Sequence, residues 1–260
     1  MKFIHVSDLH FHRDNNDNNA IIKPLNFIHK NYKNHYLIVT GDIADDGHHE
    51  QFENAYNVLS KFMFPDGKPK VFICPGNHDF GASGSFFSKE RAIRFDAMLS
   101  KPLKQGGTFT GDTTPVVNVL KETMGGVTTE VMLIALDTNL ETEHPFDFAC
   151  GEVGDKQLAA LKNIVLNPST AHMKKILFFH HHPFMYNDPF MELKDARELL
   201  RTIYGRVDVI LFGHKHVSQM WTLRNDIPYI LAADNTPGKK FAREIDITGT
   251  TITVKDIAIA

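Results

Sequence analysis

The feature of this sequence that most limits its possible folds is a series of six short apolar runs, each ending at a turn that contains glycine or polar residues. The runs have four to six residues and are rich in β-branched and aromatic side chains: FIHV (3–6), YLIVT (36–40), KVFIC (70–74), VMLIAL (131–136), KILFF (175–179) and DVILF (208–212). Runs of this length and composition predict strands that are buried on both faces.

Helical patterns lie between these runs. Apolar residues recur at helical spacing over 20–32, 50–62, 89–99, 155–166 and 188–204. Strand followed by helix, repeated along the chain, predicts βαβ units and an α/β fold with a largely parallel core.

The remaining segments differ in character. The stretch 101–126 is rich in glycine and threonine and predicts a loop with one strand over 116–120. The C-terminal part, about 218–260, is β-rich and predicts a hairpin around Thr248 and Gly249. Neither a linker nor an internal repeat is visible, so we expect one domain over residues 1–260.

Composition excludes several classes of protein. A net charge of −3 argues against an extended nucleic-acid face, which would show as a basic excess. Two cysteines give no disulfide framework, and neither a secretory signal nor an apolar run long enough to cross a membrane is visible. We therefore expect a cytoplasmic protein that does not enter the membrane and for which a nucleic acid is an improbable partner.

Groups that bind divalent metals follow five of the six apolar runs. They are Asp8 and His10, then Asp42, then Asn77, then His181, then His214 and His216. In open α/β sheets ligands bind at the carboxyl ends of the strands. Each short motif alone is more often a turn or a surface feature, but their occurrence in order, each after a strand, predicts a shared metal site.

These motifs carry a resemblance to a known family. D-x-H (8–10), G-D (41–42), G-N-H-D (76–79), H-x-P (181–183) and G-H-x-H (213–216) together resemble the calcineurin-like metallophosphoesterase superfamily. The resemblance implies a four-layer α-β-β-α sandwich with mixed sheets and a two-metal centre at the strand ends. Within this superfamily, the sequence most resembles the small bacterial class that includes cyclic nucleotide phosphodiesterases and glycerophosphodiesterases.

Protein Ser/Thr phosphatases match less well. They carry Val-Asp-Arg-Gly after the G-D motif, where this chain has IADDG (43–47), and Glu after G-N-H, where it has Asp79. The missing arginine puts phosphoprotein phosphatase activity in doubt.

The resemblance also implies the role of each residue. The first metal takes Asp8, His10, Asp42 and His216, and the second takes Asp42, Asn77, His181 and His214, so that Asp42 bridges them. Manganese, iron, zinc or cobalt would suit these ligands. A bridging water, acidified to hydroxide, would attack phosphorus. His78 would be the general acid, steadied by a carboxylate such as Asp8.

The choice of substrate rests on fewer residues. His12 shares the parity of His10, and both His12 and His182 are candidates to contact substrate. We expect a small phosphodiester such as a cyclic nucleotide or a glycerophosphodiester. The alternatives are a phosphomonoesterase or nuclease of the same superfamily and, outside enzymes, a partner-binding scaffold. The β-rich C-terminus offers an edge for a homodimer.

Overall fold

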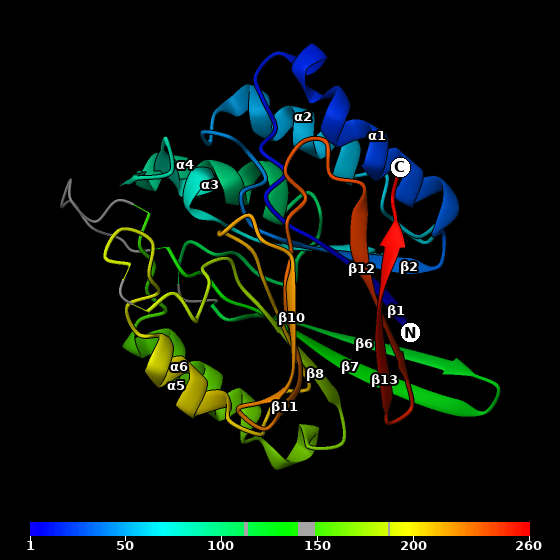
Figure 1. Cartoon of the computed structure of the whole chain (residues 1–260). Helices are drawn as coiled ribbons and strands as arrows, with labels where there is room; N and C mark the ends of the chain where they lie inside the picture. Colours follow the sequence, from blue (N-terminus) through cyan, green and yellow to red (C-terminus); the bar gives the residue numbers. More distant parts are fainter. Residues whose placement is uncertain (112–113, 140–148, 187) are drawn as a thin grey trace.

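The computed structural model describes residues 1–111, 114–139, 149–186 and 188–260. Two β-sheets are stacked face to face, and helices cover the outer face of each (Figure 1). This is the four-layer α-β-β-α sandwich with mixed sheets, and it confirms the expected fold class.

The first sheet has the order β13-β12-β1-β2-β3. β1, β2 and β3 run parallel, whereas β12 and β13 are antiparallel to their neighbours. The bounds are β1 (Lys2–Val6), β2 (His35–Thr40), β3 (Val71–Cys74), β12 (Phe241–Thr248) and β13 (Thr251–Ala258). The expected C-terminal hairpin is thus present, and it extends the N-terminal sheet.

The second sheet has the order β10-β11-β9-β8-β7-β6, with the four inner strands parallel and both edge strands antiparallel. Its bounds are β6 (Val116–Met124), β7 (Val127–Ala135), β8 (Lys174–Phe178), β9 (Val209–Phe212), β10 (Gln219–Arg224) and β11 (Ile227–Ala232). All six strands predicted from the apolar runs, and the predicted strand over 116–120, are therefore present.

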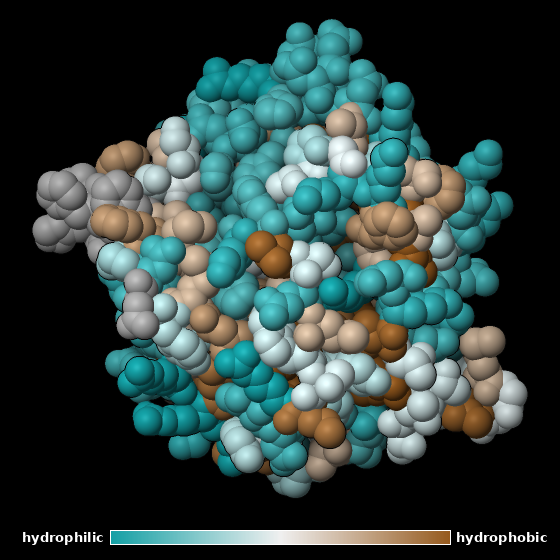
Figure 2. Space-filling model, viewed as in Figure 1, coloured by the Kyte–Doolittle hydropathy of each residue, from teal (hydrophilic) through white to brown (hydrophobic). Residues whose placement is uncertain are grey.

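The helices form the two outer layers. On the first sheet lie α1 (Asn19–Asn31), α2 (His49–Leu59) and α4 (Lys89–Phe95), and on the second lie α5 (Asp155–Val165) and α6 (Ala196–Ile203). Short elements complete the fold: η1 (Asn15–Asn18), α3 (Asn77–Phe80), β4 (Gly81–Ala82), β5 (Phe86–Phe87), the π-helical turn η2 (Asp96–Ser100) and η3 (Pro168–Thr170). The surface over α1 and α2 is mostly hydrophilic (Figure 2), as expected of helices whose buried residues face a sheet.

One predicted helix was too long. The pattern over 188–204 predicted a mostly helical segment, but α6 begins only at Ala196. The preceding chain instead pairs with Gly151, whose N–H donates to the Glu192 carbonyl and whose carbonyl accepts from Lys194 N–H. Backbone hydrogen bonding to a distant segment has overridden the local apolar spacing here.

The faces of β8 and β9 show how the layers share the core. Ile176, Phe178 and Leu211 belong to the apolar core that also contains the first sheet. Leu177 and Phe179, which alternate with them, belong to the core under α5 and α6. Since side chains alternate along a strand, residue parity decides which layer a side chain enters.

Candidate metal centre

The predicted site lies where strands of both sheets end. Asp8 and His10 follow β1, Asp42 follows β2, Asn77 follows β3, and His214 and His216 follow β9. Backbone hydrogen bonds hold these loops together, among them His10 N–H to the Asp42 carbonyl (2.9 Å). Four loops from two sheets therefore converge on one place.

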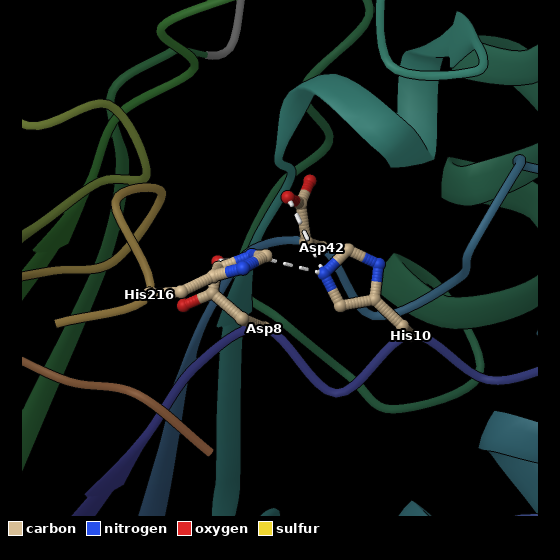
Figure 3. Close-up of side chains that lie close together, drawn as sticks. All are labelled: Asp8, His10, Asp42 and His216. Atoms are coloured by element: carbon tan, nitrogen blue, oxygen red, sulfur yellow. Dashed lines mark hydrogen bonds and ion pairs between the residues drawn. The ribbon is translucent and has the colours of Figure 1, made fainter. Parts of the chain in front are cut away.

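Asp8, His10, Asp42 and His216 form a first cluster (Figure 3). His10 Nε2 lies 3.3 Å from His216 Nε2 and 3.9 Å from an Asp42 oxygen, and His216 Nε2 lies 3.5 Å from Asp8 Oδ1. These side chains point toward one another, and their ligand atoms lie within 4.8 Å of one another, so they could hold one metal ion.

Asp42, Asn77, His180 and His214 form a second cluster. His180 Nε2 lies 3.1 Å from Asp42 Oδ2, 2.9 Å from Asn77 Oδ1 and 3.1 Å from His214 Nδ1. Asn77 Oδ1 also lies 3.0 Å from His214 Nδ1. Asp42 Oδ2 thus stands between the two clusters, which is where a bridging carboxylate belongs.

The second cluster contains His180 in the position that the sequence assigned to His181. His180 continues the inward face of Ile176 and Phe178, whereas His181 continues the face of Phe179, away from the first sheet. His181 Nδ1 instead pairs with Thr138 Oγ1 at 2.8 Å, and its ring packs against that of His214. The structure thus brings His180, not His181, next to Asp42 and Asn77, and which of the two histidines binds a metal stays a prediction.

Carbonyl oxygens fix the tautomers of the second cluster. His180 Nδ1 donates to the Thr40 carbonyl at 2.8 Å, and His214 Nε2 donates to the Met191 carbonyl at 3.2 Å. With a cation bound in place of a proton, the other nitrogen of each ring, which faces Asp42 or Asn77, can offer a lone pair. Metal-ligating histidines in general are oriented by such an outer hydrogen bond.

The backbone is strained at these positions. Asp8, His10, Asp42, His214 and His216 all have positive φ angles, between 48° and 75°. Non-glycine residues rarely adopt this left-handed region, and strain of this kind persists where the surrounding structure requires it, often at functional sites.

Two glycines allow the loops to approach so closely. A Cβ atom on Gly213 would lie 1.9 Å from Ser7 Oγ, and one on Gly76 would lie 2.3 Å from the Asp42 backbone nitrogen. Any side chain at either position would push apart loops that carry the clustered residues.

The electrostatics also suit cations. Asp8 is fully buried, burial raises its pKa, and its Oδ2 has no hydrogen-bond partner among the described residues. Burial alone would lower the pKa of His180, but the Asp42 charge and hydrogen bond raise the pKa to about 9. In the protein alone a proton on His180 therefore offsets the buried charge of Asp42. A buried carboxylate with an unused oxygen, beside imidazole and amide ligands, fits divalent cations.

His78 lies at the edge of the first cluster. Its ring contacts the ring of His10 edge to face, its Nδ1 donates to the Asp45 carbonyl at 2.7 Å, and its backbone N–H donates to Asp42. The hydrogen-bond partner of the ring is therefore Asp45, not Asp8 as expected. The Asp45 carboxylate in turn lies 3.5 Å from His10 Nδ1.

Asp79, the last residue of G-N-H-D, anchors the loop. Its carboxylate accepts hydrogen bonds from the backbone N–H groups of Ile43, Ala44 and Gly76. Burial, with the nearby Asp42 charge, raises its pKa to about 7.

The two expected substrate-contacting histidines have different surroundings. His12 is half-exposed, with Nδ1 3.7 Å from Asp45 Oδ2, and so lies at the rim of the first cluster. His182 is buried against Phe184, Phe212 and Trp221, and burial lowers its pKa to about 4. The structure thus buries His182 among aromatic side chains, and contact of either histidine with substrate stays a prediction.

Two members of the site were missed from the sequence. The H-x-P motif led to His181 rather than its neighbour His180, and Asp45 was quoted only within IADDG (43–47). The signal for Asp45 was its spacing of three from Asp42, which places both carboxylates on one tight loop after β2.

Comparisons with known proteins agree with this geometry. A family model described as calcineurin-like phosphoesterase matches residues 1–218. A 3′,5′-cyclic-nucleotide phosphodiesterase from Nostoc sp. (strain PCC 7120) is 24% identical over 199 residues. That match covers 75% of this chain but only 60% of the relative's length.

Solved structures show the same fold at low sequence identity. A dimetal phosphatase from Danio rerio superposes with a TM-score of 0.67 at 15% identity, covering 100% of this chain and 96% of that one. The anchor protein GAP50 of the Plasmodium inner membrane complex gives 0.58 at 13% identity, covering 100% and 84%. Within the described residues, no helix is both long and apolar enough to cross a bilayer.

Proposed function

We propose, from the premise that this chain belongs to the calcineurin-like phosphoesterases, that it hydrolyses a small phosphodiester at a centre of two divalent cations. The observation that carries the proposal is the position of Asp42. One of its carboxylate oxygens lies 3.1 Å from His180 and 3.9 Å from His10, between two sets of ligand atoms.

The residues divide into two ligand sets that share Asp42. Asp8, His10, Asp42 and His216 would hold the first cation, and Asp42, Asn77, His180 and His214 the second. When bound, such a pair makes water nucleophilic near neutral pH and neutralises charge on the phosphoryl oxygens. Nitrogen and oxygen ligands suit manganese, iron, zinc or cobalt.

His78 is the proposed general acid. Because Nδ1 donates to the Asp45 carbonyl, Nε2 is the nitrogen that can carry a second proton to the leaving oxygen. The same hydrogen bond holds the ring in a fixed orientation. Asp8, fully buried, is the proposed ligand rather than the group that steadies His78.

A diester is favoured over a monoester by the Nostoc relative, whose name gives a cyclic-nucleotide phosphodiesterase activity. A small substrate is favoured over a polymer because the net charge is −3. A phosphomonoesterase and a nuclease remain the alternative activities.

The proposal is tested by loading the purified protein with manganese. Bis(p-nitrophenyl) phosphate should be hydrolysed faster than p-nitrophenyl phosphate, and 2′,3′- and 3′,5′-cyclic nucleotides should be compared next. Chelator and Asn77→Ala should each abolish turnover, whereas Asn57→Ala, on the exposed face of α2, should not. Turnover that survives both chelator and Asn77→Ala would contradict the proposal. A folded, metal-loaded protein without turnover would favour the scaffold alternative.

A further inference from the structure

A cavity of about 480 Å³ adjoins the first cluster. Its lining includes His216, which also belongs to that cluster. The other walls come from 217–218 after β9, 233–235 after β11, and 239–243 at the start of β12. The volume lies in the range of small-molecule sites, and the shared histidine places one end of the cavity at the reacting centre.

Most charged groups of the cavity are paired. Arg243 is buried and donates to Asp256, to Ser218 Oγ and to the carbonyls of Gln219 and Ala232. Lys239 lies 2.7 Å from Asp234. Lys240 is exposed and has no ion pair in the part of the chain that the structure describes. One cationic group is thus available to a ligand.

An apolar surface lies beside that lysine. Phe241, which follows it, is 65% exposed, and Val217 on the opposite loop is 44% exposed. Both line the cavity. The face over β10, β11 and β12 indeed mixes apolar and polar atoms (Figure 2). An exposed aromatic at the rim of a concave site offers a platform for a planar or apolar group.

His5 also belongs to the lining of the cavity. The residue is fully buried, its Nε2 pairs with Thr40 Oγ1 at 2.9 Å, and its Nδ1 has no hydrogen-bond partner among the described residues. A buried polar atom without a partner is costly, so this end of the cavity wall is polar but closed to solvent.

Much of this cavity lies outside the matched family region. The family model ends at residue 218, whereas Asp234, Lys240, Phe241 and Arg243 come later in the chain. The proposed metal ligands thus lie inside the matched region, whereas most residues that line the cavity come after it.

We propose that the cavity binds the organic group that stays on phosphorus, and that it favours a phosphodiester whose organic group carries a second anion, such as a phosphate. This inference rests on the proposed function and names the substrate class of the same site. A planar ring in that organic group packs on Phe241, and the second anion pairs with Lys240.

The test uses three esters with the same p-nitrophenol leaving group. They are methyl p-nitrophenyl phosphate, thymidine 5′-(p-nitrophenyl phosphate), and the latter bearing a 3′-phosphate. The wild-type protein should favour the 3′-phosphorylated ester over the plain thymidine ester by about tenfold in kcat/KM. Lys240→Glu should remove that preference and leave the methyl ester unchanged.

Two variants sharpen the assignment. Phe241→Ala should lower kcat/KM for both thymidine esters, mainly through KM, but not for the methyl ester. Lys162→Glu, the same charge change on the exposed side of α5, should alter none of the three. If Lys240→Glu acts on all three esters alike, or on none, the subsite is wrong although the proposed function stands.

A complete absence of turnover would refute the proposed function, but the proposed role of the cavity can still be tested by binding. Binding of thymidine 3′,5′-bisphosphate, measured by calorimetry with chelator present, would then decide. An affinity about tenfold weaker in Lys240→Glu than in Lys162→Glu supports the subsite, and equal affinities overturn it.

Discussion

At the scale of single residues, the side chains of the adjacent histidines 180 and 181 face in opposite directions. His180 faces Asp42 and Asn77, whereas His181 faces Thr138. We predict that His180→Ala binds one equivalent of manganese fewer than the wild-type protein, because the second ligand set loses a nitrogen. His181→Ala should keep both equivalents. Metal content after dialysis, measured by mass spectrometry, checks this.

The control for this pair is folding. Both histidines are fully buried, so either variant can lose stability through its cavity. Circular dichroism should therefore accompany the metal assay. A folded His181→Ala protein that lacks one metal, beside a His180→Ala protein that keeps both, would restore the ligand set inferred from the H-x-P motif.

His78 carries the second prediction at this scale. His78→Gln should lower kcat for a phosphodiester by about 10²–10⁴, the usual contribution of a general acid. Metal content should not change, because His78 is outside both proposed ligand sets. A loss of metal together with activity would instead make His78 a ligand.

The sequence predicted most of the site because motif and strand end coincide at each position. Asp8, His10, Asp42, Asn77, His214 and His216 are all brought together as expected, and their binding of metal stays a prediction. The sequence could not decide which histidine of 180–182 faces Asp42 and Asn77. β8 is buried on both faces, so its sequence contains no alternation that marks the inward one. Only the partner sheet defines that face.

At the scale of elements, β3 shows how an edge strand is closed. β3 is the last strand of its sheet, but the buried side chain of Gln105 continues the hydrogen bonding. Its Oε1 accepts from Ile73 N–H at 2.8 Å, and its Nε2 donates to the Val71 carbonyl at 2.9 Å. One amide thus takes the place of a neighbouring strand.

We predict that Gln105→Leu lowers the free energy of unfolding by about 1–3 kcal/mol, because a buried donor and acceptor lose their partners. Urea denaturation measures the change. Gln219→Leu, on the exposed edge strand β10, is the matched control and should stay within about 0.5 kcal/mol of the wild type. Equal effects in both variants would mean that Gln105 contributes no strand-like bonding.

The elements themselves were predictable where burial and local pattern agree. The six strands predicted from apolar runs were found because those runs are apolar almost throughout. The helix expected from 188 was too long because residues 192 and 194 pair with Gly151, about forty positions earlier. Contacts of that range leave no periodic signal in the sequence.

At the scale of the whole molecule, one buried histidine links stability to pH. Burial, with the nearby Arg243 charge, lowers the pKa of His5 to about 3 in the folded protein. The unfolded value is about 6.5. Above pH 6.5 the ring is neutral in both states. Between about pH 6.5 and 3 only the unfolded state gains the proton, so stability falls as the pH falls.

We therefore predict that His5→Gln has a shallower loss of stability on acidification. The difference in slope between wild type and variant should approach about 1.4 kcal/mol per pH unit below pH 6. Denaturation at several pH values measures it, with His172→Gln, an exposed site, as the control. Parallel profiles for wild type and His5→Gln would show that His5 is charged in the folded state.

The proposed metal centre lies between the two sheets, so bound cations should act on the stability of the whole chain. Asp8, Asp42 and Asn77 follow strands of the first sheet, whereas His180 and His214 follow strands of the second. Cations bound among them exist only in the folded arrangement. At a free concentration of 100 times Kd, each site should stabilise the fold by about 2.7 kcal/mol. For a chain of this size that corresponds to about 5–10 °C in Tm per site.

Asp42→Ala should lose most of the manganese-dependent shift in Tm, because both sites share that carboxylate, while Glu53→Ala on the exposed face of α2 should keep it. A full shift in Asp42→Ala would locate the stabilising cations elsewhere on the molecule and remove the physical basis of a shared, sheet-bridging centre.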